Sequence, residues 1–137
     1  MANATDVLHR VSRDIPTIHA AHWLIRLPLA AIIINQAVMK FPLTAADADS
    51  WGLPFWMWAL SAFAELGAGI ALIAGGLRRN AVGDVLTRLA GLAIAGVVIG
   101  VLYVVYWAPL LDLWLANQFH ILLLVGGLYF ALRGNHA

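Results

Sequence analysis

The 137-residue chain is too apolar for a water-soluble domain, since 63% of its residues are hydrophobic and 11% are charged. Soluble domains average about 45–50% apolar and about 25% charged residues, and one small core cannot bury the difference. The net charge of +1 argues against nucleic-acid binding. The absence of cysteine excludes thiolate-held iron–sulfur clusters and the chemistry of four-helix membrane thiol oxidases.

Residues 1–22 predict a short amphipathic segment on the cytoplasmic surface of the membrane. Its apolar positions recur at helical spacing beside basic positions, a pattern typical of helices that lie in the membrane interface. The apolar residues are Val7, Val11, Ile15 and Ile18, and the basic ones are Arg10 and Arg13.

Four apolar stretches follow, and each exceeds the length of about 10–14 residues that would suggest a soluble core helix. They cover residues 23–41, 54–77, 85–108 and 114–132. Polar or turn-forming residues separate them at 42–50, at 78–84, and at Pro109 and Asp112. The sequence therefore predicts an all-α fold: an integral membrane four-helix bundle over 23–132 and a cytoplasmic tail over 133–137.

The distribution of charge predicts that both termini lie in the cytoplasm. Of the eight Lys and Arg residues, only Lys40 falls at the other predicted end of the spans, where the loops carry Asp47, Asp49 and Asp112. Cytoplasmic loops are enriched in Lys and Arg, so this asymmetry sets the orientation. Tryptophans at the predicted span ends fit interfacial anchors first and ligand-stacking residues second. They are Trp23, Trp51, Trp56, Trp58, Trp107 and Trp114.

Small residues spaced four apart predict close helix contacts in lipid. The second span carries Gly67, Ala71 and Gly75, and the third carries Gly96 and Gly100. The pattern favours packing within the bundle over packing against a second copy, although the spacing alone is compatible with both.

Each predicted span carries its polar residues along one face at 100° per residue. Because charges that face lipid are costly, we expect the four faces to point at one another. The faces are Arg26, Leu29, Ile33, Gln36 and Lys40; Trp58, Ser61, Glu65, Gly69 and Leu72; Arg88, Leu92, Gly96, Ile99, Tyr103 and Tyr106; and Asn117, His120, Leu124 and Gly127.

Most of these polar groups fall in the outer half of the bilayer at about 1.5 Å per residue, and Glu65 lies deepest, about 16 Å from the outer boundary. The sequence thus predicts a pocket that opens toward the extracytoplasmic side, with Glu65 at its floor. Its predicted catalytic residues are Glu65 and His120, and its predicted ligand-binding residues are Gln36, Lys40, Tyr103, Tyr106 and Asn117. Arg26 and Arg88, near the inner boundary, are predicted structural anchors.

Each polar group also has a plainer interpretation. Intramembrane carboxylates are functional by default, but Glu65 could equally be neutral through desolvation or brace the bundle through His120, Gln36 or Arg26. Lys40 could be a terminal anchor. Haem ligation by His120 would need another histidine at similar depth, from a second copy of the chain. His19 and His22 lack a third ligand nearby, so no metal site is predicted.

Two segments carry a resemblance to a known family. Arg26 is followed fourteen positions later by Lys40-Phe41, and residues 65–72 read Glu-Leu-Gly-Ala-Gly-Ile-Ala-Leu before Gly75-Gly76-Leu77-Arg78-Arg79. In these two spans the chain resembles the DoxX/DoxD family of small four-helix bacterial membrane proteins. Arg26, Lys40 and Glu65 would correspond to that family's recurrent first-span Arg, terminal Lys and second-span Glu. The sequence departs from the family at Ala37, where a glycine is usual, and at His120.

The resemblance implies association with redox complexes, because the family includes a membrane subunit of a thiosulfate:quinone oxidoreductase. The expected function is therefore that of a subunit or accessory protein of a respiratory or sulfur-type oxidoreductase in the bacterial cytoplasmic (inner) membrane. A quinone is the expected ligand, with no covalent cofactor, and the expected partners are lipid and other membrane subunits or a second copy. The alternatives are a non-enzymatic interaction subunit and a small-solute permease, which would have to oligomerise.

Overall fold

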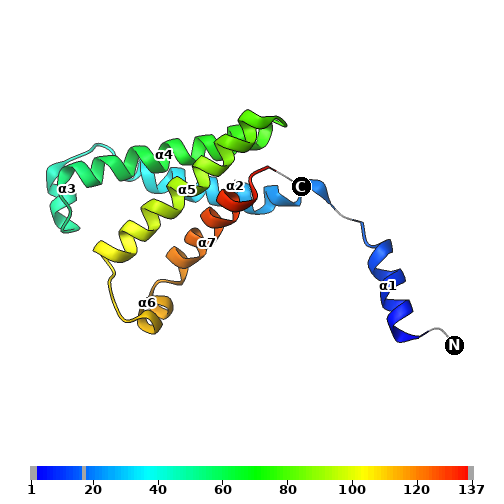
Figure 1. The fold of residues 1–137 in the computed structure, drawn as a ribbon. Coiled ribbons are helices and arrows are strands. Elements are labelled where there is room, and N and C mark those ends of the chain that lie inside the picture. The colour runs from blue at the N-terminus through cyan, green and yellow to red at the C-terminus, as the bar shows by residue number, and fades with distance from the viewer. Residues whose placement is uncertain (1–2, 17, 136–137) are drawn as a thin grey trace.

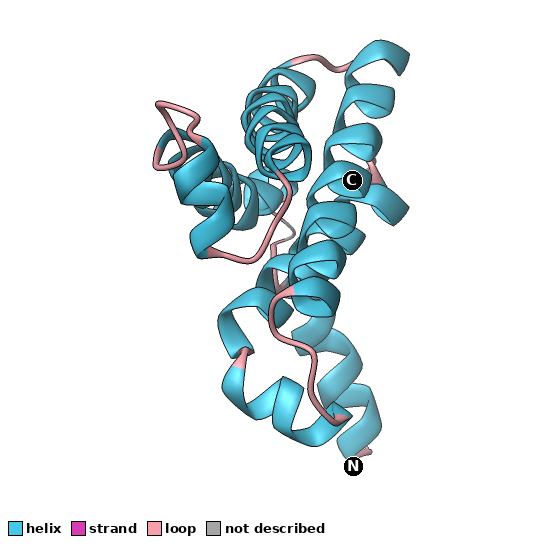
Figure 2. Ribbon diagram, turned by 90° about the vertical axis from the view of Figure 1, so that its left-hand side faces the viewer, coloured by secondary structure: helices cyan, strands magenta, loops and turns pink. Residues whose placement is uncertain are grey.

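The computed structural model describes residues 3–16 and 18–135, and within these ranges the chain forms helices and loops without a strand (Figures 1 and 2). A short helix α1 and one 3-10 turn η1 precede the bundle, and two short helices, α3 and α6, lie in its connections. The elements are α1 (Ala4–Asp14), η1 (His19–His22), α2 (Trp23–Val38), α3 (Ala45–Ser50), α4 (Phe55–Leu77), α5 (Ala81–Val104), α6 (Leu110–Ala116) and α7 (Gln118–Arg133).

Three helical segments are long and apolar enough to cross a membrane: His19–Val38, Phe55–Leu77 and Ala81–Val104. A fourth crossing is possible if α6 and α7, which are bent by 95° at their junction, count as one broken span. The described residues therefore have the make-up of a multi-pass membrane protein.

The four long helices pack in the order α2, α4, α5, α7. Helix α4 packs along both α2 and α5, and α5 packs along α7, whereas α2 and α7 meet only over a short stretch. We call the end where α2 and α5 begin and α4 and α7 end the Arg26 end, and the opposite one the Lys40 end. The core between the helices is apolar and includes Leu29, Ile33, Leu72, Ile94 and Phe130, each at most 5% exposed.

Close backbone contacts occur at only some of the glycines that the spacing singles out. A Cβ on Gly75 would lie 2.5 Å from the Thr87 hydroxyl, so α4 and α5 do approach closely there. Gly67, Gly96 and Gly100 instead have open space around the Cβ position. Helices α5 and α7 also approach closely, since a Cβ on Gly91 would lie 2.4 Å from the Ala131 backbone nitrogen and 2.5 Å from the Gly127 carbonyl oxygen.

The fourth apolar stretch is not the single helix predicted over 114–132. Asn117 has φ −122° and ψ 36°, outside the helical region, and it separates α6 from α7. Asparagine favours such breaks because its side chain competes for local backbone hydrogen bonds. Asp112, predicted to lie in a turn, belongs to α6.

Helix α5 also differs from the helix predicted over 85–108. It begins earlier because the Asn80 side chain accepts a hydrogen bond from the Gly83 backbone and caps the first turn. The face predicted to point inward is largely exposed: Leu92, Ile99 and Tyr103 are 53–67% exposed. Small residues on the neighbouring face allow the close contacts with α4 and α7, so that face is buried instead. It comprises Thr87, Ala90, Gly91, Ile94, Ala95 and Val98.

Helix α1 extends away from the bundle and buries no residue (Figure 1). Its apolar residues Val7, Leu8 and Val11 are exposed along one side, consistent with an amphipathic helix. That it lies on a membrane surface stays a prediction.

Candidate functional site

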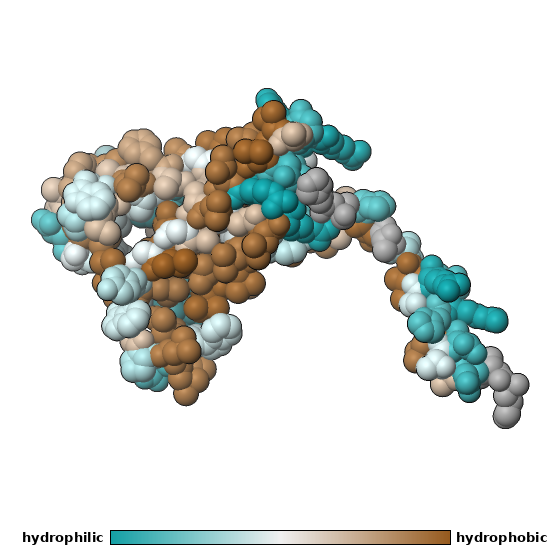
Figure 3. Space-filling model, viewed as in Figure 1, coloured by the Kyte–Doolittle hydropathy of each residue, from teal (hydrophilic) through white to brown (hydrophobic). Residues whose placement is uncertain are grey.

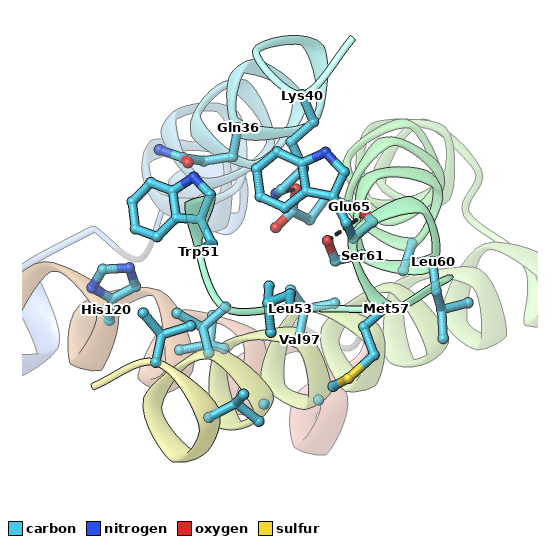
Figure 4. A pocket seen from close by; sticks show the side chains of 18 of the residues that line it. Gln36, Lys40, Trp51, Leu53, Met57, Leu60, Ser61, Glu65, Val97 and His120 are labelled. Atoms are coloured by element: carbon cyan, nitrogen blue, oxygen red, sulfur yellow. Dashed lines mark hydrogen bonds and ion pairs between the residues drawn. The ribbon is translucent and has the colours of Figure 1, made fainter. Parts of the chain in front are cut away.

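The helices separate toward the Lys40 end and leave a cavity of about 760 Å³. Figure 3 shows a hollow in this part of the molecule, and Figure 4 shows the side chains around it. The walls come from α2, α4, α5, α7 and the segment after α3, and they are mostly apolar and aromatic. Polar groups reach the cavity from six lining residues: Gln36, Lys40, Ser61, Glu65, Tyr106 and His120.

An ion pair between Lys40 and Glu65 is the most distinctive feature of the cavity wall. The Lys40 ammonium donates a hydrogen bond to the Glu65 carboxylate, and the two side chains are 13% and 6% exposed. The sequence-based alternatives for a bracing partner of Glu65 were His120, Gln36 and Arg26, and none of them holds this position. Lys40 reaches Glu65 because it lies just past the end of α2, which packs along α4. It is therefore more than a terminal anchor.

Three tryptophans that the sequence placed at span ends line the cavity, namely Trp51, Trp56 and Trp58. The Lys40 ammonium lies over the Trp58 ring, 5.5 Å from the ring centre. This cation–π contact stabilises the charged form of Lys40 in its largely buried position. The buried Trp58 indole nitrogen has no hydrogen-bond partner among the described residues. A buried donor of this kind costs free energy until a water or a ligand satisfies it.

On the opposite side of the cavity, His120 packs against the ring of Tyr106 at a centroid distance of 5.1 Å. In Figure 4, Gln36, Trp51 and His120 lie along one side, while Ser61 and Glu65 lie along the other. A flat ligand between these two sides would have hydrogen-bonding groups at both of its ends and aromatic surface along its faces.

The structure brings together five of the seven predicted catalytic and ligand-binding residues. Tyr103 is 67% exposed and packs against Trp107, outside the cavity. Asn117 is buried at the break between α6 and α7 and does not line the cavity. Ser61 was expected on the inward face of α4 but was not among the predicted site residues, although it lies one turn before Glu65 and lines the same wall.

A second polar cluster closes the Arg26 end of the bundle. Arg26 is fully buried, and its guanidinium donates to the Leu72 carbonyl at 2.5 Å, to Thr87 at 3.1 Å and to the Asn135 side chain at 2.8 Å. It also lies over the Phe130 ring, 4.6 Å from its centre. Arg26 is thus an internal link between four elements, rather than a side chain that reaches toward the interface.

Asn135 was missed by the sequence analysis, which placed it in a cytoplasmic tail without a structural role. Its amide nitrogen donates to the carbonyls of Gly75 and Arg78, which satisfies backbone oxygens at the end of α4. Arg88 on α5 likewise satisfies backbone oxygens at a helix end. It pairs with Asp84 and donates to carbonyls at the end of α7. No sequence motif predicts that an asparagine after the last helix connects other helices.

The described residues contain no group of three or more His, Asp or Glu side chains that could hold a metal ion. His19 and His22 line a separate cavity of about 500 Å³, next to Tyr129 and Arg133.

Comparisons of the chain with protein-family models, with curated proteins and with solved structures found no match.

Proposed function

We propose that this protein is a quinone-binding membrane subunit or accessory protein of a respiratory or sulfur-type oxidoreductase. The observation that supports this most is one charged pair, Lys40–Glu65, in the wall of a mostly apolar, tryptophan-lined cavity of about 760 Å³. Ligand cavities of about 300–1,000 Å³ with few convergent polar groups are typical of sites for small lipophilic molecules.

A quinone head group matches the chemistry of the cavity. Its two carbonyl oxygens need hydrogen-bond donors, which Lys40 on one side and His120 or Gln36 on the other can supply, and its ring can stack on tryptophan. Oxidation of a quinol releases two protons, of which the Glu65 carboxylate can accept one and the His120 ring nitrogen the other. The two electrons pass in this proposal to a redox centre on a partner subunit.

In the same proposal both termini lie on the cytoplasmic side of the bacterial inner membrane, with α6 and α7 forming the fourth crossing. The Arg26 network supports placing both ends of the bundle on one side, because it joins α2, α4, α5 and the segment after α7. The excess of Arg at that end assigns that side to the cytoplasm in this proposal. In Figure 3, hydrophilic residues gather at the Arg26 end and on α1, whereas the visible sides of the long helices between the two ends of the bundle are mostly apolar. The cavity then opens in the outer half of the membrane.

The orientation can be tested with single cysteines, because the chain has none of its own. Asp49→Cys in α3 and Arg79→Cys after α4 are both at exposed positions. We expect a membrane-impermeant maleimide to label Asp49→Cys in intact cells and Arg79→Cys only after permeabilisation. The reverse pattern would move the cavity to the inner half, and labelling of both in intact cells would contradict the four-crossing arrangement.

Ligand binding can be measured with the purified protein in lipid nanodiscs. Because three tryptophans line the cavity, a ubiquinone analogue should quench tryptophan fluorescence saturably, and His120→Phe should weaken binding about tenfold by removing a hydrogen-bond group while keeping a ring. Phe119→Leu, at an adjacent apolar lining position, is the control. Non-saturable quenching that is the same in every variant would mean that the quinone only dissolves in the lipid.

The second candidate is a non-enzymatic interaction subunit. One observation favours it: Lys40 and Glu65 already satisfy each other without a ligand, as a bracing pair would. Co-purification in mild detergent separates the two candidates, since only the first requires a redox enzyme as the partner.

A further inference from the structure

The cavity has a lateral opening between α4 and α5. On the α4 side its edge is formed by Leu60, which is 61% exposed, and on the α5 side by Gly96, which is also exposed, and both residues line the cavity. A Cβ placed on Gly96 or on Gly100 would find nothing within 4 Å. Because both glycines also line the cavity, its wall is open here, although α4 and α5 pack closely at Gly75 and Thr87, nearer the Arg26 end.

In the proposed membrane arrangement, the opening lies at the depth of the hydrocarbon. Leu60 is five residues from the start of α4, or about 8 Å along the helix axis, and Gly96 is eight residues from the end of α5, or about 12 Å. Next to the opening, Ala64, Val97 and Val104 line the cavity with apolar side chains. The charged pair and His120 lie on other parts of the wall (Figure 4).

We infer that the α4–α5 opening binds the hydrocarbon tail of the ligand and that Gly96 leaves the space for it. This inference rests on the proposed quinone-binding function and goes further by assigning a tail site. A ligand whose head lies between Lys40 and His120 and whose tail leaves past Gly96 keeps every polar atom in the cavity and every methylene group in apolar surroundings. The cavity holds a head ring, and the tail continues into the lipid.

The test compares two ubiquinone analogues, one with a single isoprene unit and one with four, on proteins in nanodiscs of the same lipid composition. Gly96→Phe fills the opening. Gly67→Phe is the matched control, because Gly67 is also exposed and has open space at its Cβ, yet it does not line the cavity. Each analogue is compared only with itself across the variants, so its partitioning into lipid cancels.

We expect Gly96→Phe to weaken binding of the four-isoprene analogue about tenfold and to change binding of the one-isoprene analogue less than twofold, with no change for Gly67→Phe. Retained short-tail binding also shows that the variant is folded. If Gly96→Phe does not fold, Leu60→Trp on the facing edge replaces it. Equal losses for both analogues, or no loss for the long one, would overturn the tail site, whereas failure of the wild type to bind either analogue would overturn the proposed function itself.

Discussion

The Asn135→Leu variant is expected to lose about 1.5–3 kcal/mol of unfolding free energy, the range for a hydrogen bond to a charged group. The substitution removes the acceptor of the Arg26 guanidinium and of the Thr87 hydroxyl, and it removes the donor to two carbonyls at the end of α4. Arg26 would then be a buried cation with one fewer partner, since its side chain is fully enclosed. Unfolding with increasing SDS in mixed micelles measures the loss.

Asn35→Leu is the control, because Asn35 is exposed on α2 and, among the described residues, its side chain bonds only to Met39 just after that helix. It should be neutral. Adding Arg26→Met to Asn135→Leu should recover part of the lost unfolding free energy, because it removes the buried guanidinium that Asn135→Leu leaves without one of its partners. A stability equal to wild type in Asn135→Leu would show that the Arg26 network contributes nothing measurable.

For Glu65→Gln we expect normal insertion and assembly but a loss of quinone-linked turnover of about a hundredfold, the scale of general acid–base catalysis. Glutamine keeps the shape and can still accept a hydrogen bond from Lys40, but it cannot take up a proton. Turnover is measured on the complex obtained by co-purification in mild detergent.

Ser61→Ala is the matched control, since Ser61 lies one turn away in the same wall and its hydroxyl bonds to the Trp58 carbonyl instead of to the ion pair. The double variant Lys40→Met/Glu65→Leu removes both charges at once, so it should assemble without turning over. Full turnover in assembled Glu65→Gln would rule out a proton role. Failure of Glu65→Gln to assemble would instead favour the bracing pair and the interaction-subunit candidate.

The sequence predicted the helical class and the inward faces of two helices well. On α2 and α4 the polar residues share a face with the buried ones: Arg26 lies with Leu29 and Ile33, and Glu65 with Leu72. Helical spacing alone is sufficient there, because one strongly polar residue per helix marks the side that must avoid lipid.

The same rule was wrong for Tyr103 on α5, which was predicted on the inward face and is 67% exposed, although Arg88 on the same predicted face does contact α7. An aromatic residue near a helix end can lie at a membrane interface, so it does not report which side packs. The buried small residues Gly91 and Ala95 do mark the side of α5 that packs, but small residues also occur at exposed positions such as Gly96. The Lys40–Glu65 and Arg26–Asn135 contacts depend on how the helices are placed relative to one another, which periodicity within one helix does not contain.

The link between Arg26 and Asn135 joins residues 109 positions apart, so it sets an order of events during synthesis. When α2, α4 and α5 have been made, Arg26 can already bond to Leu72 and Thr87, but its third partner does not yet exist. The Arg26 guanidinium therefore lacks one of its three partners until the segment after α7 has been made. The Arg26 end can be completed only after all the helices of the bundle exist.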